Sequence, residues 1–298
     1  MTTQTPSEAE RGPLGNWVQG ARPRTLPAAI VPVLVGTLAV RPLALSLPRA
    51  LLAGVVALGM QIGTNYQNDY ADGIRGSDDV RVGPVRLVGQ KLATPKAVRL
   101  AAVVSFLVAA IAGLVLCALS SWCLIVPGVL GVVAGWLYTG GPKPYGYMGL
   151  GELFVLAFFG VVATAGSSYV QHRTIPAVSW IASIAVGLLA TALLEANNLR
   201  DIDGDLPVGK KTLAVRLGRS RAGWLFVASY IGAAAAIVAA AFFRPWALLG
   251  LLGLLAALPS CRLALSGQSG KALLPMLKSS GRTQLLVGGL LALGLALA

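Results

Sequence analysis

Long apolar segments separated by short polar ones run through almost the whole chain. Each segment has about 20 residues, the length of a helix that crosses a hydrocarbon core of roughly 30 Å. The pattern predicts an all-α integral membrane protein with nine transmembrane helices. We expect them at residues 25–45, 50–68, 98–119, 122–138, 150–170, 175–197, 222–243, 246–265 and 285–298. The last segment is short for a full crossing.

The N-terminal segment is polar and lacks the early apolar core of a signal peptide. We expect residues 1–16 to form a disordered cytoplasmic tail. Residues 17–298 then form a single transmembrane domain.

The composition supports a membrane protein, because only 12% of the 298 residues are charged and mean hydropathy is +0.74. A soluble domain needs more charge to cover its surface. The net charge of +13 lies in short loops between apolar segments, which argues against nucleic acid as a partner. The chain has one histidine, His172, and three cysteines without a CxxC pair, which argues against zinc or histidine catalysis.

Basic residues predict the topology through the positive-inside rule. With the N-terminus in the cytoplasm, only four of the 24 Lys and Arg residues fall on the outer side: Arg41, Arg49, Arg173 and Arg244. An odd number of helices then places the C-terminus outside.

Acidic residues gather in two clusters that both follow even-numbered helices and so share the cytoplasmic side. The clusters are Asp69, Asp72, Asp78 and Asp79, and Asp201, Asp203 and Asp205. Asn65-x-x-x-Asp69 recurs as Asn197-x-x-x-Asp201, and each is followed by Asp-Gly. This similarity suggests a parallel internal repeat.

The spacing within each cluster places Asn and Asp side chains on one helix face. Their hard oxygens suit Mg²⁺, which takes a few carboxylates together with phosphate oxygens of its substrate. Two facing carboxylate pairs would therefore hold metal ions around a diphosphate. The alternative is that these residues are solvated helix ends. Asp78, Asp79 and Asp203 fit that alternative better.

Basic side chains beside the clusters, such as Arg75 and Lys210, could stabilise a leaving diphosphate or contact lipid headgroups. Lys143 lies in a Gly-, Pro- and Tyr-rich loop that begins at Tyr138, where it could bind phosphate or anchor the loop at the interface. Arg22 and Arg24 precede the first helix and could snorkel or bind an anionic aromatic substrate.

Several segments resemble the UbiA-type intramembrane prenyltransferase superfamily: Asn68-Asp69-Tyr70-Ala71-Asp72-Gly73, Asn197-Asn198-Leu199-Arg200-Asp201-Ile202-Asp203-Gly204-Asp205 and Gly209-Lys210-Lys211-Thr212-Leu213. Arg22-Pro23-Arg24-Thr25-Leu26-Pro27 and Gly141-Pro142-Lys143-Pro144-Tyr145 are similar to the menaquinone branch, the 1,4-dihydroxy-2-naphthoate polyprenyltransferases. The resemblance extends from Trp17 to Ala298. Gly76 stands where the broader superfamily often has a further Asp, which leaves the number of metal ions open.

The resemblance implies nine helices around a central cavity, with cytoplasmic cap loops, in the inner (plasma) membrane. It implies Mg²⁺ as the cofactor, held by Asn68, Asp69, Asp72, Asp201 and Asp205. We expect catalytic roles for Asp69, Asp72, Asp201, Asp205 and Lys143. We expect substrate contacts from Asn65, Asn68, Arg22, Arg24, Arg75, Tyr138, Asn197 and Lys210.

The implied reaction is transfer of a polyprenyl group from its diphosphate to 1,4-dihydroxy-2-naphthoate, with loss of CO₂, to give demethylmenaquinone. The alternatives are another aromatic acceptor such as 4-hydroxybenzoate, a transporter, or a lipid-binding scaffold. The acidic residues of transporters usually lie near the membrane midplane, whereas both Asp clusters of this chain lie at one face of the membrane. A scaffold would not need two matched motifs.

Overall fold

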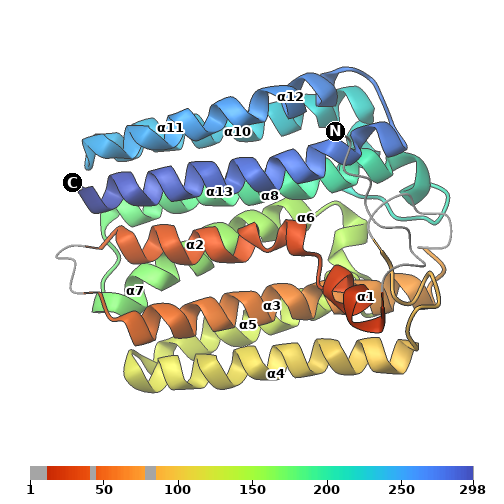
Figure 1. Cartoon of the computed structure of the whole chain (residues 1–298), viewed down its shortest axis with the longest axis horizontal. Coiled ribbons are helices and arrows are strands. Elements are labelled where there is room, and N and C mark those ends of the chain that lie inside the picture. The colour runs from red at the N-terminus through yellow and green to blue at the C-terminus, as the bar shows by residue number, and fades with distance from the viewer. Residues whose placement is uncertain (1–11, 41–44, 78–84, 298) are drawn as a thin grey trace.

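The computed structural model describes residues 12–40, 45–77 and 85–297, and throughout these ranges the chain forms helices and connections without a strand. The long helices lie side by side in one bundle (Figure 1). α1 (Pro13–Gly20) lies at one end of the bundle, and α13 (Leu274–Leu297) ends at the opposite end (Figure 1).

Seven helical runs in the described residues are long and apolar enough to cross a membrane. They are α3 (Leu47–Ile74), α4 (Pro95–Leu119), Gly151–His172, α8 (Ala177–Asp205), α10 (Arg219–Ala241), Pro245–Leu265 and Gly270–Leu297. The first composite run contains α6 (Gly151–Val155), a π-helical stretch (Leu156–Ala165) and α7 (Gly166–His172). The second contains α11 (Leu249–Gly253) and α12 (Leu258–Leu265).

Two shorter apolar helices, Pro27–Leu38 and Trp122–Leu137, lie within the remaining predicted segments, 25–45 and 122–138. The first of them is α2 (Pro27–Leu38), and the second contains α5 (Ile125–Leu137). α2 packs against α3, α7, α8 and α13, so it lies within the bundle rather than at its rim. Its interior Pro32 removes one backbone donor and its residues are mostly buried.

The predicted start of the last helix was wrong, because the helical run begins at Gly270 rather than at residue 285. Lys278 and Arg282 interrupt the apolar pattern, but both are exposed on the outer face of α13. Ser280 and Gln284 face the protein interior instead. A helix with polar residues inside and basic residues outside does not show the apolar run that the prediction relied on.

The N-terminal tail falls largely outside the described residues. Within the predicted tail, Pro13 to Asn16 already belong to α1, so helical structure begins earlier than we expected.

α3 and α8 extend through the two acidic motifs, and this extension positions the candidate site. Asp69 and Asp72 therefore lie on α3, and Asp201 and Asp205 lie on α8. The exposed Asp203 also belongs to α8, where it pairs with Arg219 at 2.9 Å. Asp78 and Asp79 lie outside the described residues.

Short elements cover the end of the bundle where these motifs meet. A 3-10 helix, Tyr145–Met148, comes from the Gly- and Pro-rich loop, and α9 (Leu213–Leu217) follows the second motif. Thr212 caps α9 by accepting the amide of Val215. Gly209, with φ of 73°, provides the left-handed turn between α8 and this cap.

Candidate functional site

A large cavity of about 1300 Å³ lies inside the bundle. One part is lined by polar and charged side chains, including Asn68 and Asp72 on α3, Arg200 on α8, and Lys210 in the connection that follows α8. Apolar residues of α3, α4, α5 and the Gly151–His172 run line the rest, among them Met60 and Phe158. Ligand pockets for drug-sized molecules have roughly 300–1,000 Å³. The cavity thus suits a ligand with a charged head and a long apolar tail.

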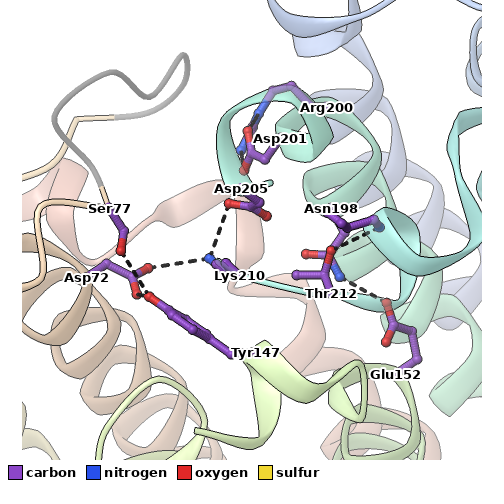
Figure 2. A network of polar contacts seen from close by, with 11 residues as sticks. Asp72, Ser77, Tyr147, Glu152, Asn198, Arg200, Asp201, Asp205, Lys210 and Thr212 are labelled. Atoms are coloured by element: carbon purple, nitrogen blue, oxygen red, sulfur yellow. Dashed lines mark hydrogen bonds and ion pairs between the residues drawn. The ribbon is translucent and has the colours of Figure 1, made fainter. Parts of the chain in front are cut away.

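Lys210 joins the two acidic motifs at the polar end of this cavity (Figure 2). Its ammonium nitrogen lies 3.6 Å from Asp72 Oδ2 and 3.6 Å from Asp205 Oδ1. All three side chains are almost completely buried. Because Asp72 Oδ2 and Asp205 Oδ1 both lie 3.6 Å from the same nitrogen, they are at most twice 3.6 Å apart. The two acidic residues come from α3 and α8, so the fold brings together motifs more than 130 positions apart in the sequence.

Tyr147 fixes the orientation of Asp72 (Figure 2). Its hydroxyl donates a hydrogen bond of 2.8 Å to Asp72 Oδ1, and Ser77 Oγ lies 3.1 Å from the same hydroxyl. Burial, followed by the charge of Asp72, raises the pKa of Tyr147 above its ordinary value. The phenol therefore stays protonated at neutral pH and remains a donor.

Asp69 has a different environment, although it belongs to the same motif. It is fully buried and accepts hydrogen bonds from the backbone amides of Leu87 (2.8 Å) and Val88 (3.0 Å). Both oxygens therefore hold the loop that follows α3. The neighbouring Arg86 is buried and lines the cavity. Asp69 thus positions the loop that carries Arg86 to the cavity.

Asp201 also has its own partner. Arg200 donates to both of its oxygens at 2.7 Å in a buried bidentate pair. Arg200 also lines the cavity, and its buried Nη1 makes no hydrogen bond with any other part of the described chain. Buried donors are nearly always satisfied, so this nitrogen is well placed to contact an anionic ligand.

The asparagines of the two motifs have unequal roles. Asn65 Nδ2 donates to the carbonyl of Ala21 and to Thr25 Oγ1, which ties α3 to the segment that carries Arg22 and Arg24. Asn68 Oδ1 accepts from Thr139 at 2.8 Å. Asn197 donates to the carbonyl of Leu193 on its own helix and lines the cavity.

The structure brings most of the predicted substrate contacts to the cavity. Those that line it are Arg22, Arg24, Asn65, Asn68, Tyr138, Asn197 and Lys210, and the predicted catalytic residue Asp72 lines it as well. The predicted catalytic residues Asp69, Asp201 and Asp205 are not part of the lining. Two other predicted residues also lie outside it. Arg75 is exposed and donates to the carbonyls of Thr139 and Gly141, and Lys143 is exposed and lies outside the cavity lining.

The acidic residues do not form one cluster of four. Within the described ranges, no group of three or more His, Cys, Asp or Glu side chains is placed to hold a metal ion. Asp72 and Asp205 do converge, and they offer hard oxygens from two helices. Mg²⁺ commonly binds through one or two carboxylates together with substrate phosphates and water. These two residues therefore fit a Mg²⁺–diphosphate complex, in which the substrate supplies the remaining oxygens.

Aromatic side chains follow one another along the cavity wall. The rings of Tyr138 and Tyr145 meet edge to face at 5.4 Å, Tyr145 stacks on Phe154 at 4.0 Å, and Phe158 follows at 6.1 Å. Burial raises the pKa of both tyrosines above the ordinary value, so both rings carry neutral phenols. Such a row provides a π surface for a cation.

Sequence reasoning missed several residues of this site. Arg200 stands directly before Asp201, and that adjacency was the available signal. Tyr147 and Thr139 lie in a loop whose Tyr and Lys residues suit interfacial anchoring equally well. Only the tertiary fold shows that they contact Asp72 and Asn68.

Residues 29–274 match the UbiA prenyltransferase family. This chain belongs to that family. A 1,4-dihydroxy-2-naphthoate octaprenyltransferase of Mycobacterium tuberculosis (strain ATCC 25618 / H37Rv) is 47% identical over 93% of this chain and 97% of the relative. A protein of the same name from Escherichia coli (strain K12) is 36% identical over 94% of this chain and 95% of the relative.

Solved structures support the same fold at lower sequence identity. The apo structure of a UbiA homolog from Aeropyrum pernix K1 has a TM-score of 0.68 at 17% identity, covering 92% of this chain and 97% of that one. A UbiA homolog from Archaeoglobus fulgidus, bound to GPP and Mg²⁺, has a TM-score of 0.65 at 13% identity, covering 93% of this chain and 99% of that one. The all-helical bundle of this prenyltransferase is therefore the UbiA fold.

Proposed function

We propose that this prenyltransferase transfers a polyprenyl group from its diphosphate to 1,4-dihydroxy-2-naphthoate, releasing CO₂ and diphosphate and forming demethylmenaquinol, which oxidises to demethylmenaquinone. The observation that carries the proposal is the convergence of Asp72, Asp205 and Lys210 at the polar end of a long apolar cavity. The names of the relatives at 47% and 36% identity support the naphthoate acceptor.

The head of the prenyl diphosphate binds at the polar end of the cavity. Asp72 and Asp205 would hold Mg²⁺ there, and the metal would supply positive charge that neutralises the diphosphate. Arg200, Arg86 and Lys210 line the same region and supply further positive charge as the C–O bond breaks. The metal at this site is inferred from the donor set and from the Mg²⁺-bound Archaeoglobus structure.

The prenyl tail extends along the apolar walls of the cavity. Positive charge that develops on the allylic carbon faces the ring row Tyr138, Tyr145, Phe154 and Phe158. The apolar lining also excludes water, which would otherwise capture this carbon.

The acceptor adds through the ring carbon that bears its carboxylate. A C–C bond forms to the allylic carbon while diphosphate leaves with the electron pair of the broken C–O bond. The bond to the carboxylate then breaks, CO₂ departs, and its electron pair restores the aromatic ring. Arg22 and Arg24 line the cavity beside Asn65 and are candidates to hold the carboxylate before reaction.

We further propose nine transmembrane crossings in the bacterial plasma membrane, with the motif end of the bundle and the N-terminus in the cytoplasm. The two shorter apolar helices supply the eighth and ninth crossings. The basic loops beside the motifs support this orientation.

The test is the mass of the product. Detergent-purified protein is incubated with Mg²⁺, a polyprenyl diphosphate and 1,4-dihydroxy-2-naphthoate, with and without EDTA. We expect a prenylated naphthoquinone without the carboxylate, formed only when EDTA is absent. Product from 4-hydroxybenzoate instead would overturn the acceptor assignment but keep the prenyl transfer. No product from any acceptor would overturn the proposed activity.

A further inference from the structure

The position of Lys210 has a consequence for how the site binds metal. The ammonium lies at the same distance from one oxygen of Asp72 and one oxygen of Asp205. At 3.6 Å these contacts are too long for strong hydrogen bonds, but they are within ion-pair range. Lys210 thus shares its charge between the two motifs instead of binding one carboxylate tightly.

Burial makes this charge balance necessary. Asp72 and Asp205 are 1% and 4% exposed, and Lys210 is 5% exposed. Two buried carboxylates without a compensating cation would be strongly unfavourable. The ring of Tyr147, with its centroid 5.3 Å from the Lys210 nitrogen, provides another favourable contact for the ammonium.

The ammonium and a metal ion cannot use the same two oxygens together. Mg²⁺ binds carboxylate oxygens at about 2.0–2.1 Å. A divalent ion between Asp72 and Asp205 would therefore meet the lysine charge at short range in a poorly hydrated site, where repulsion between the two cations is strong.

Lys210 lines the cavity, so its side chain has open space into which it can turn. The preceding residues 206–209 are exposed, and Gly209 has φ of 73°. Asp205 is joined to Lys210 by a backbone hydrogen bond of 3.0 Å, which keeps the lysine beside the site when its side chain turns.

We propose that Lys210 is the counter-ion of the substrate-free site. It neutralises Asp72 and Asp205 until Mg²⁺ displaces its ammonium, which then turns toward the diphosphate. The inference rests on the proposed function, because it assumes that these carboxylates bind the metal. It differs from a lysine that only binds phosphate, since it predicts that Lys210 opposes metal binding when diphosphate is absent.

Thermal unfolding of the detergent-purified full chain tests this competition. The midpoint of Mg²⁺-dependent stabilisation is measured without diphosphate or acceptor for the wild type, Lys210→Met and Lys211→Met. Lys211 is the adjacent, exposed lysine and is the matched control. We expect Lys210→Met to reach half-maximal stabilisation at a Mg²⁺ concentration at least tenfold lower than the wild type and Lys211→Met. We also expect it to gain less from added inorganic diphosphate.

An unchanged Mg²⁺ midpoint in Lys210→Met, or loss of Mg²⁺ stabilisation in that variant, would overturn the inference. Lys210→Arg keeps the charge and should retain a midpoint close to that of the wild type.

The wild type provides an independent measurement that does not depend on a variant folding. Acylation of Lys210, measured by peptide mass spectrometry, should increase when Mg²⁺ alone is added, relative to acylation of Lys211. Equal acylation with and without Mg²⁺ would contradict displacement. Both measurements use no acceptor, so their failure is distinguishable from failure of the proposed prenyl transfer, which the product assay of the wild type tests.

Discussion

Substitution of Asp69 distinguishes between two roles for its carboxylate, which are positioning the loop after α3 and binding the metal. Its carboxylate accepts the amides of Leu87 and Val88, and it is fully buried. Asp69→Ala removes both acceptors and leaves two backbone donors unsatisfied. Each such donor costs about 1–3 kcal/mol, so the free energy of unfolding should fall by about 2–6 kcal/mol. Asp69→Asn retains one acceptor and should cost about half as much.

Loss of these two hydrogen bonds should also lower activity, because it displaces the loop. Arg86 directly precedes Leu87 and lines the cavity, so a displaced loop should raise the KM for the prenyl diphosphate. The Mg²⁺ concentration for half-maximal activity, measured at saturating diphosphate substrate, should stay close to that of the wild type. Asp72→Asn is the comparison variant, because it removes a proposed metal ligand and should raise that concentration at least tenfold.

The assays are thermal unfolding in detergent and initial rates over a Mg²⁺ titration for the wild type, Asp69→Asn and Asp72→Asn. An Asp69→Asn protein that unfolds at the wild-type temperature yet needs tenfold more Mg²⁺ would refute the reasoning. It would show that Asp69 is a metal ligand, as the motif alone had suggested.

Three other variants test separate parts of the account. Tyr147→Phe removes the hydrogen bond to Asp72, which is worth about 0.5–3 kcal/mol. It should lower kcat/KM in initial-rate assays. An unchanged kcat/KM would mean that Asp72 does not need Tyr147 to orient it. Gly128→Phe adds a side chain where no atom lies within 4 Å of a Cβ and where the wall faces the cavity. It should abolish turnover of long prenyl diphosphates but retain short ones in a chain-length series, whereas Gly289→Phe, outside the cavity lining, should retain both. Phe154→Leu removes one ring of the aromatic row. It should lower kcat about tenfold with little change in KM, measured by single-turnover kinetics. A change confined to KM would contradict a role in stabilising the cation.

The sequence was sufficient to predict the class of fold because apolar segments of membrane-spanning length are a direct physical requirement. The sequence also predicted roles for Asp72 and Asp205 from their motifs and for Lys210 from its place beside them, and the structure brings these three side chains together. The predicted start of the last helix was wrong because Lys278 and Arg282 break the apolar run while pointing outward.

The differences within the two motifs could not be predicted from spacing. Asn65-x-x-x-Asp69 and Asn197-x-x-x-Asp201 have the same pattern, yet Asp69 binds loop amides and Asp201 binds Arg200. The amides that Asp69 binds come from a loop 18 and 19 residues later. Helix periodicity places side chains on a face, but the partner that approaches that face depends on tertiary packing.

The most direct measurement follows CO₂ and diphosphate together. Purified protein is given 1,4-dihydroxy-2-naphthoate labelled at the carboxylate carbon, a polyprenyl diphosphate and Mg²⁺, and labelled CO₂ and diphosphate are quantified over time for the wild type, Asp72→Asn and Asp205→Asn. The account predicts equal molar release of the two products by the wild type and, at the same sub-saturating Mg²⁺ concentration, release of both products at least tenfold slower by the variants. Diphosphate released without labelled CO₂, or undiminished release of both by the variants, would contradict it.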